Sequence, residues 1–452
     1  MVFAVAIVLL VLGTLAFHFL SPWFFTPIAS NWEMVDQTVN VTFWVTGIVF
    51  VVVNLFMAYS VFRFRHRKGN TAHYEPENKK LEWWLTIVTS VGIAAMLAPG
   101  LSVWAKFVTP PPTASVVEVL GQQWNWSYRL PGKDGALGAT DPRLISLANP
   151  FGIDPKDPKG QDDVLIGNPE LHLPVDHDIR MAMRSIDVNH QFAVPQFRMK
   201  MDLVAGMITS FWFKTTQVGS YDALCEQLCG LAHFAMRGRV VVEPDEQYQK
   251  WLAQQPTFAQ VKEEVAGDVV AGKALYSVCS ACHGDQAQGN RDLNAPKLNG
   301  QAGWYLARQL RNFKSGLRGA SERDTNAKAM LPFAQTLADD TAIKNVVAYI
   351  NSLPEVRPQQ TVSGNPERGK AIYDNCVACH GVKGQGIWAT NAPRLADMSD
   401  WYLRHQLQNF KDGIRGSKDD RLDFYGAQMA SMARALRSQQ AIDDVIDYLH
   451  NL

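Results

Sequence analysis

The stretch that decides the fold is residues 225–236, which read CEQLCGLAHFAM. It carries two thiols, Cys225 and Cys229, followed by His233 and Met236, and a further histidine, His190, lies upstream. Thiolate and imidazole together with a thioether select copper, as in the electron-transfer sites of cupredoxin β-sandwiches. A mononuclear site of this kind needs only one thiolate. The second cysteine, four residues away, therefore predicts two bridged copper ions that share one electron.

Two other interpretations use part of the same stretch. Cys225 and Cys229 could form a disulfide in an oxidising compartment, or they could bind zinc together with His233. Neither interpretation gives a role to Met236 or His190, so the copper centre is preferred.

The sequence around this stretch is typical of β structure. Short segments rich in β-branched and aromatic residues lie between turn residues, at 116–120, 124–130, 178–183, 207–215 and 239–243. Residues 132–174 are rich in Gly, Pro and Asp and are predicted to form a long surface loop. A cupredoxin-like antiparallel β-sandwich is the expected arrangement of these segments.

Three long apolar runs precede the β segments, at residues 2–20, 37–62 and 83–105. Each reaches about the 20 residues that a helix needs to span a bilayer. The first run lacks the leading Lys or Arg and the clear cleavage site of a signal peptide, so we expect it to remain as a helix. The loop between the second and third runs is basic and should be cytoplasmic; its Lys and Arg residues are Arg63, Arg65, Arg67, Lys68, Lys79 and Lys80. The residues after the third run are then extracytoplasmic.

Toward the C-terminus the chain has two C-x-x-C-H motifs, at residues 279–283 and 376–380. This motif attaches a c-type haem, with the histidine as the proximal iron ligand. The motifs predict two covalently bound haems, one held by Cys279, Cys282 and His283 and the other by Cys376, Cys379 and His380. All six cysteines of the chain then have a role.

The two motifs belong to an internal repeat. Matching residues lie 97 apart, such as Gly272 and Gly369, and 99 apart after a two-residue insertion in the second copy. Each copy ends in an amphipathic helix, at residues 341–353 and 440–452. Zinc or thioredoxin-like interpretations do not explain the histidine after each cysteine pair. The repeat therefore predicts two small all-α domains that resemble class I cytochromes c.

The sixth ligand of each iron is predicted from the same alignment. Methionine is the usual ligand opposite the histidine when a high potential is needed. Met330 aligns with Met429 when the copies are matched on the leucines that follow, whereas Met432 aligns with Phe333. We therefore predict Met330 and Met429 as axial ligands and Met432 as a core residue.

Residues from about 35 to 250 resemble subunit II of the haem–copper cytochrome c oxidases, most closely at 121–128, 187–200 and 225–236. The resemblance implies a binuclear CuA centre, and it implies as ligands His190, Cys225, Cys229, His233, Met236 and the backbone carbonyl of Gln227. It also places Trp124 where electrons reach the copper in this family, although an aromatic residue that merely packs on the sandwich would look the same. The family usually has Glu in place of Gln227, and that Glu helps to hold magnesium. We therefore expect no ordinary magnesium ligand from this chain.

The segment at 81–86, LEWWLT, resembles the start of the second helix of oxidase subunit II. In that family a Glu at this position marks the mouth of a proton path into subunit I, which gives Glu82 a proposed role in proton uptake. With the basic loop inside, its carboxylate lies at the cytoplasmic edge of the bilayer. Thr89 replaces a proline that is common in the family, and the helix dipole alone also favours Glu at a helix N-terminus.

Residues 265–452 resemble the dihaem c4-type cytochromes, which place their axial methionines at the positions of Met330 and Met429. The whole chain is thus similar to subunit II of a caa-type oxidase with two fused cytochromes c. The predicted domains are an N-terminal transmembrane helix (1–30), a transmembrane hairpin (31–112), a CuA cupredoxin domain (113–250) and two cytochrome c domains (265–355 and 362–452).

This resemblance implies that electrons pass from the haems to CuA and on to subunit I, where oxygen is reduced and protons are translocated. The apolar runs lack a cluster of histidines, so the oxygen site is not expected on this chain. The expected partners are subunits I and III, a bc1-type complex or a soluble cytochrome c as donor, and the lipid of a bacterial inner membrane. The alternatives are the electron-input subunit of a CuA-type nitric oxide reductase and a membrane-tethered electron carrier. Lys+Arg and Asp+Glu both total 43, which argues against a nucleic-acid binder.

Overall fold

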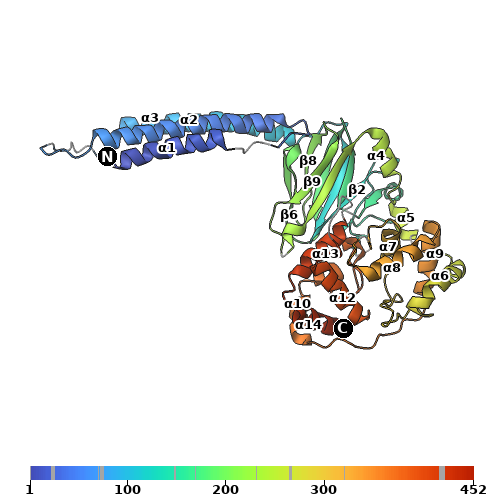
Figure 1. The fold of residues 1–452 in the computed structure, drawn as a ribbon. Coiled ribbons are helices and arrows are strands. Elements are labelled where there is room, and N and C mark those ends of the chain that lie inside the picture. The colour runs from blue at the N-terminus through green and yellow to red at the C-terminus, as the bar shows by residue number, and fades with distance from the viewer. Residues whose placement is uncertain are drawn as a thin grey trace.

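The computed structural model describes residues 2–21, 26–69, 71, 76–146, 149–167, 169–230, 232–263, 267–319, 321–416 and 423–452. Three long helices project to one side of a β domain, and a helical region lies against one end of that domain (Figure 1). The long helices are α1 (Val2–Leu20), α2 (Glu33–Arg63) and α3 (Lys79–Phe107).

The three helices are long and apolar enough to cross a membrane, as the sequence predicts. Their large side chains point outward, and on α3 the side chains of Trp83, Trp84 and Trp104 are 61–68% exposed. An apolar surface of this extent is favourable only when it is removed from water. The chain is therefore anchored in a membrane by its N-terminal part.

Polar contacts fix the ends of these helices to the β domain. Arg198 donates hydrogen bonds to both carboxylate oxygens of Asp36 on α2, at 2.5 and 2.8 Å. At the end of α3, the carbonyl of Lys106 accepts a hydrogen bond of 2.7 Å from the Trp212 indole. The buried indole of Trp32 donates to the carbonyl of Trp212 at 2.9 Å. These contacts hold the β domain close to the membrane.

The β domain is a sandwich of two five-stranded sheets, with the strand orders β3-β2-β1-β5-β8 and β4-β10-β9-β6-β7. Its core lies between the sheets, where the buried ring of Trp126 meets that of Phe192 edge to face at 5.0 Å. The strands are β1 (Ser115–Gln122), β2 (Asn125–Leu130), β3 (Val164–Ile166), β4 (Glu170–Pro174), β5 (Asp178–Ser185), β6 (His190–Val194), β7 (Met199–Leu203), β8 (Thr209–Lys214), β9 (Gly219–Cys225) and β10 (Arg237–Glu243).

The sandwich differs from the expected one in three respects, and the first is that β6, β7 and β9 are not among the five strands predicted from the sequence. Strand β1 pairs with β5, and β4 with β10, in parallel, so the sheets are mixed rather than purely antiparallel. These partners are far apart in the sequence, and no turn signal between them reveals the pairing. The predicted loop at 132–174 is also wrong at its end, which forms β3 and β4. Both are short edge strands among Gly and Pro residues, which hide the alternation of side chains.

The helical region contains the two repeats, one after the other. Helices α4 (Asp245–Leu252) and α5 (Phe258–Glu263) follow the sandwich. The first copy has α6 (Val269–His283), α7 (Gly303–Lys314), α8 (Thr325–Gln335) and α9 (Asp340–Ser352). The second copy has α10 (Pro366–Tyr373), α11 (Val377–His380), α12 (Asp400–Lys411), α13 (Phe424–Arg434) and α14 (Gln439–His450).

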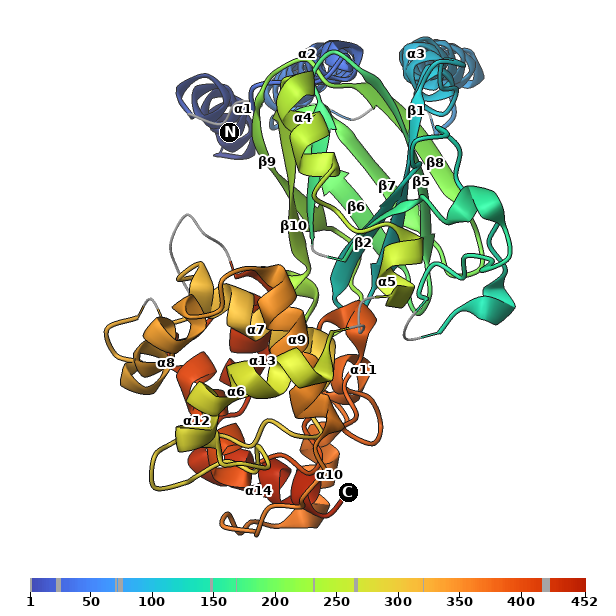
Figure 2. The ribbon, with the colours of Figure 1, turned by 90° about the vertical axis from the view of Figure 1, so that its right-hand side faces the viewer.

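The first and last helices of each copy pack against each other, and a repeated glycine makes this packing possible. A Cβ added to Gly272 would lie 2.0 Å from the carbonyl oxygen of Asn345, and one added to Gly369 would lie 2.0 Å from that of Asp444. Only glycine permits such an approach. The two copies lie beyond the same end of the sandwich (Figure 2), where α13 contacts the short helix η4 (His233–Ala235) of the β domain.

Candidate copper centre and haem cavities

A cluster of metal-binding side chains lies at the end of the sandwich that faces the helical region. Strand β6 begins at His190 and the adjacent β9 ends at Cys225, with Phe192 opposite Cys225 in the antiparallel register. The loop after β9 then brings Cys229 back to the same point. The ligand atoms of His190, Cys225 and Cys229 all lie within 4.8 Å of one another.

The other predicted ligands surround the same two thiols. The Sγ atoms of Cys225 and Cys229 are 3.7 Å apart. The Cys229 Sγ lies 3.6 Å from His233 Nδ1 and 3.8 Å from Met236 Sδ, and the Cys225 Sγ lies 3.2 Å from the carbonyl oxygen of Gln227. The structure thus brings together all six atoms that the sequence points to: two thiols, two imidazoles, one thioether and one carbonyl.

The histidine farthest away in the sequence shows that a metal fits this cluster. His190 is completely buried, and its Nε2 lies 2.8 Å from a carboxylate oxygen of Asp187. Its Nδ1 is also buried and has no hydrogen-bond partner among the residues that the structure describes. A carboxylate on one ring nitrogen, with the other nitrogen free, is the usual arrangement of a metal-binding histidine. A hydrogen bond from Cys229 lowers the pKa of the Cys225 thiol, which favours the thiolate that metals bind.

Asp187 orients His190, and its replacement is expected to weaken copper binding. Burial alone would raise the pKa of Asp187, but hydrogen bonds from His190 and from the Gln123 amide lower it below its ordinary value. Removing an orienting partner of this kind typically costs about 10- to 100-fold in metal affinity. We therefore expect Asp187→Asn to bind copper about 10- to 100-fold more weakly than the wild type when a chelator competes for the metal. The control is Asp222→Asn, which changes an exposed carboxylate on β9 and should keep the copper affinity of the wild type. If the two variants bind copper equally well, Asp187 does not orient His190 for the metal.

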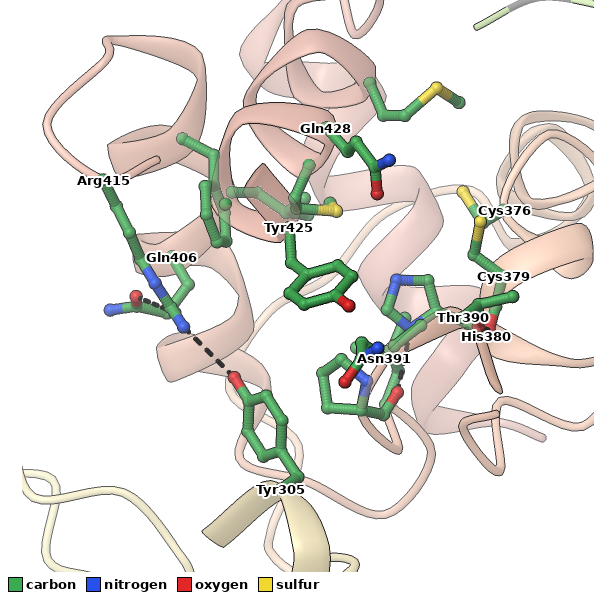
Figure 3. Close-up of a pocket in the computed structure, with 18 of the residues that line it drawn as sticks. Tyr305, Cys376, Cys379, His380, Thr390, Asn391, Gln406, Arg415, Tyr425 and Gln428 are labelled. Atoms are coloured by element: carbon green, nitrogen blue, oxygen red, sulfur yellow. Dashed lines mark hydrogen bonds between the residues drawn. The ribbon is translucent and has the colours of Figure 1, made fainter. Parts of the chain in front are cut away.

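Each cytochrome copy encloses one large cavity that holds its C-x-x-C-H motif. The cavity of the first copy spans about 1520 Å³ and that of the second about 1300 Å³, and both volumes include space that is open to solvent. Both predicted ligand sets line these cavities: Cys279, Cys282, His283 and Met330 in the first, and Cys376, Cys379, His380 and Met429 in the second. Figure 3 shows the second cavity, with the two thiols on one side and Arg415 on the other.

The two motif histidines are held in the tautomer that an iron ligand needs. The Nδ1–H of His283 donates to the carbonyl of Pro296, and that of His380 donates to the carbonyl of Pro393, both at 2.8 Å. Burial lowers the pKa of both imidazoles and keeps them neutral. The Nε2 of each ring is then available to iron. These cavities therefore fit a covalently attached haem.

The methionines also lie at the cavities. Met330 on α8 packs beside Phe313, and Met429 on α13 packs beside Phe410, at equivalent places of the two copies. Met432 lines the second cavity too, and it packs against the core of the β domain. The assignment of Met330 and Met429 as iron ligands stays a prediction.

Comparison with known proteins agrees with this arrangement. The family of the periplasmic domain of cytochrome c oxidase subunit II matches residues 115–244, and the cytochrome c family matches residues 269–354 and 366–452. The alternative cytochrome c oxidase subunit 2 of Bradyrhizobium diazoefficiens is 56% identical over 259 residues, which cover 57% of this chain and 94% of that protein. The chain belongs to the cytochrome c oxidase subunit II family.

The C-terminal part of this subunit II is similar to cytochromes c4. The cytochrome c4 of Azotobacter vinelandii is 29% identical over 196 residues, which cover 41% of this chain and 90% of that protein. A solved structure of cytochrome c4 from Acidithiobacillus ferrooxidans is 29% identical and covers 39% of this chain and 99% of its own, with a TM-score of 0.33. The subunit II domain implies a CuA centre, and the cytochrome c domains imply haem c.

Two further residues of this subunit II were predicted to act in electron or proton transfer. Trp124 is only 8% exposed, and its indole donates to the carbonyl of Cys229 at 3.1 Å, beside the metal cluster. Glu82 lies in the first turn of α3, far from the cluster, where its amide donates to the carbonyl of Asn78. Glu226, the carboxylate nearest to Gln227 in the sequence, pairs with Lys200 at 3.4 Å.

A shared wall between the two haem cavities was not predicted from the sequence. Arg318 of the first copy donates to the hydroxyl of Tyr402 in the second copy at 2.7 Å, and Arg415 of the second donates to the hydroxyl of Tyr305 in the first at 3.1 Å. Both tyrosines line both cavities. The sequence does contain a signal for this wall, because Tyr305 and Tyr402, and likewise Arg318 and Arg415, are separated by the 97-residue spacing of the repeat. The spacing alone, however, does not show that they cross between the copies.

Proposed function

We propose that this chain is the electron-input subunit II of a caa-type cytochrome c oxidase. Two c-type haems and a binuclear CuA centre on this chain would carry electrons to the haem–copper site of subunit I, which reduces O₂ to water and translocates protons. The observation that supports this most strongly is that one chain holds a subunit II metal cluster and two cavities with complete haem-attachment motifs.

The residues of the cluster have separate tasks in this proposal. Cys225 and Cys229 would hold the metals through their thiolates, and His190 and His233 through their imidazoles. Met236 and the carbonyl of Gln227 would complete the set. The bound metals supply a site that takes up and releases a single electron. Cys225, Cys229 and Met236 are almost fully buried, so the protein largely excludes water from the thiols.

Purification of the complex in detergent, with metal analysis and a gas-consumption assay, tests this function. We expect a many-helix partner of the subunit I type, two haems c and two coppers on this chain, and consumption of oxygen driven by a reduced cytochrome c. Consumption of nitric oxide rather than oxygen would identify the CuA-type nitric oxide reductase instead. A chain that purifies alone with its cofactors and consumes neither gas would be a membrane-tethered electron carrier.

The remaining assignments follow from this function. We place the complex in the inner membrane of a bacterium, with the soluble domains on the periplasmic side. Subunits I and III would pack against the exposed helices α1 to α3. The electron donor would be a bc1-type complex or a soluble cytochrome c.

Glu82→Gln is expected to slow steady-state oxygen consumption severalfold and to leave reduction of the copper by the haems unchanged. Glu82 lies in the first turn of α3, which would be the cytoplasmic end of this helix, where a proton path into subunit I would open, and glutamine cannot carry a proton. An oxygen electrode and stopped-flow spectroscopy on the same preparation measure the two rates. Glu77→Gln, outside the helix on the same side, is the control. If Glu82→Gln in an intact complex consumes oxygen at the normal rate, Glu82 has no role in proton uptake and only interacts favourably with the helix dipole.

A further inference from the structure

The second cytochrome copy, and not the first, covers the metal cluster of the β domain. The Gln428 amide on α13 donates to the carbonyl of Trp124 at 2.7 Å, and the Asn391 amide donates to the carbonyl of Gly167 at 3.0 Å. The hydroxyl of Tyr425 also donates to Gly167. Trp124 is therefore enclosed by the chain's own C-terminal domain, and a separate electron carrier cannot dock on it.

The covered tryptophan forms part of the second haem cavity. Trp124, Ala232 and Ala235 of the β domain line this cavity together with Cys376 and Cys379. The cavity that would hold the second haem thus extends to the loop that carries the metal ligands.

One residue connects the two sets of thiols. The Sγ of Cys379, which would attach the second haem, lies 3.7 Å from the carbonyl oxygen of Gln123. The side-chain amide of Gln123 donates to the carbonyl of Cys229 at 2.7 Å, and the indole of Trp124 donates to the same carbonyl. Electron tunnelling falls steeply with distance, so a gap bridged by one residue favours transfer at this point.

The first copy has no such connection. Among the described residues, all that line its cavity lie at 278 or later, in the two cytochrome copies, and none belongs to the β domain. Two of the three residues that make the contacts differ between copies: Gln428 aligns with Ala329 and Tyr425 with Asn326, whereas Asn391 aligns with Asn294. The first cavity is open on its outer side, where Leu293 is 55% exposed and Phe333 is 40% exposed.

We propose that the two cytochrome domains act in a fixed order, with the first receiving electrons from outside the chain and the second delivering them past Trp124 to the metal cluster. This inference rests on the proposed function. The external reductant is a soluble ferrous c-type cytochrome, which loses one electron and becomes ferric. The metal cluster would accept that electron, with no bond formed or broken. The wall of Tyr305 and Tyr402 is the passage between the domains.

Two matched variants test this order in the complete, cofactor-loaded complex without oxygen. Met330→His and Met429→His each replace the proposed thioether by an imidazole, which lowers the potential of one haem only. Each protein is mixed rapidly with a reduced soluble cytochrome c, and the haem and copper absorption bands are followed separately. We expect Met429→His to leave reduction of the first haem within about twofold of wild type and to slow copper reduction more than tenfold. Met330→His should slow reduction of both the first haem and the copper more than tenfold.

The contrary results are distinct. If Met429→His instead slows reduction of the first haem, or if Met330→His leaves copper reduction at the wild-type rate, the proposed order is wrong. Failure of the proposed function itself would appear in the wild type, whose copper would stay oxidised after its haems are reduced. The contact is tested by Gln428→Ala, which should slow copper reduction at unchanged haem potentials. The control is Asn326→Ala, at the position of the first copy that matches Tyr425. This variant should reduce copper at the wild-type rate.

Discussion

Replacing Cys229 with serine is expected to abolish the mixed-valence signal of the two-copper centre and to leave both c-type haems in place. The Cys229 Sγ lies 3.6 to 3.8 Å from three other predicted ligand atoms, which are Cys225 Sγ, His233 Nδ1 and Met236 Sδ. A serine hydroxyl is a harder donor that copper binds less well than thiolate, and it does not bridge two such ions in the same way. Electron paramagnetic resonance and copper analysis on the purified protein measure the loss.

The same loop provides a control for this experiment. Glu226→Gln changes an exposed side chain three residues away, which contacts Lys200 and lies outside the ligand set. It should keep the full signal and two coppers. An unchanged haem spectrum in Cys229→Ser shows that the helical region has folded. A Cys229→Ser protein that kept the copper signal would rule out this ligand set.

The second large effect is expected at the haems. Met330→Ala and Met429→Ala should each remove one sulfur–iron absorption band and lower the potential of that haem by more than roughly 0.1 V, within the range of about 0.8 V that axial ligands span. A thioether stabilises ferrous over ferric iron, so its loss favours the ferric state. Spectra of the oxidised protein and a redox titration give the two values.

Met432→Ala is the informative comparison for the second haem. Met432 lies at the same cavity as Met429, but it packs against the β domain and aligns with a phenylalanine of the first copy. We expect Met432→Ala to keep the sulfur–iron band. If this variant loses the band and Met429→Ala does not, the alignment of the second copy is wrong.

The features that the sequence predicts best are those whose residues are close together along the chain. Each C-x-x-C-H motif lies within five residues, and the two thiols, His233 and Met236 lie within twelve, so local spacing is enough to indicate the ligands. The apolar runs are equally direct, since a bilayer sets the length of a spanning helix. The internal repeat, with matching residues 97 apart, showed that the second C-x-x-C-H motif belongs to a second copy of the same domain.

The features that the sequence missed depend on pairing over long distances. The parallel pairs β1–β5 and β4–β10, and the edge strands inside the predicted loop, are fixed by hydrogen bonds between segments that no turn connects. A period-two pattern predicts a strand, but it does not name the neighbour of that strand. The role of Asp187 beside His190 was likewise visible only once β6 was placed.

By itself, the sequence determined which chemistry this chain carries, because ligand type and spacing are local properties: a copper-binding loop, two haem motifs and a membrane anchor. Only the tertiary structure decided which cytochrome copy lies against the predicted metal ligands. The two copies are nearly equivalent as folds, and the choice between them depends on a few side chains, such as Gln428 on α13, that reach the backbone of Trp124 some 300 residues away in the sequence. Contacts of this kind follow from how whole domains pack against each other, and no local pattern records them.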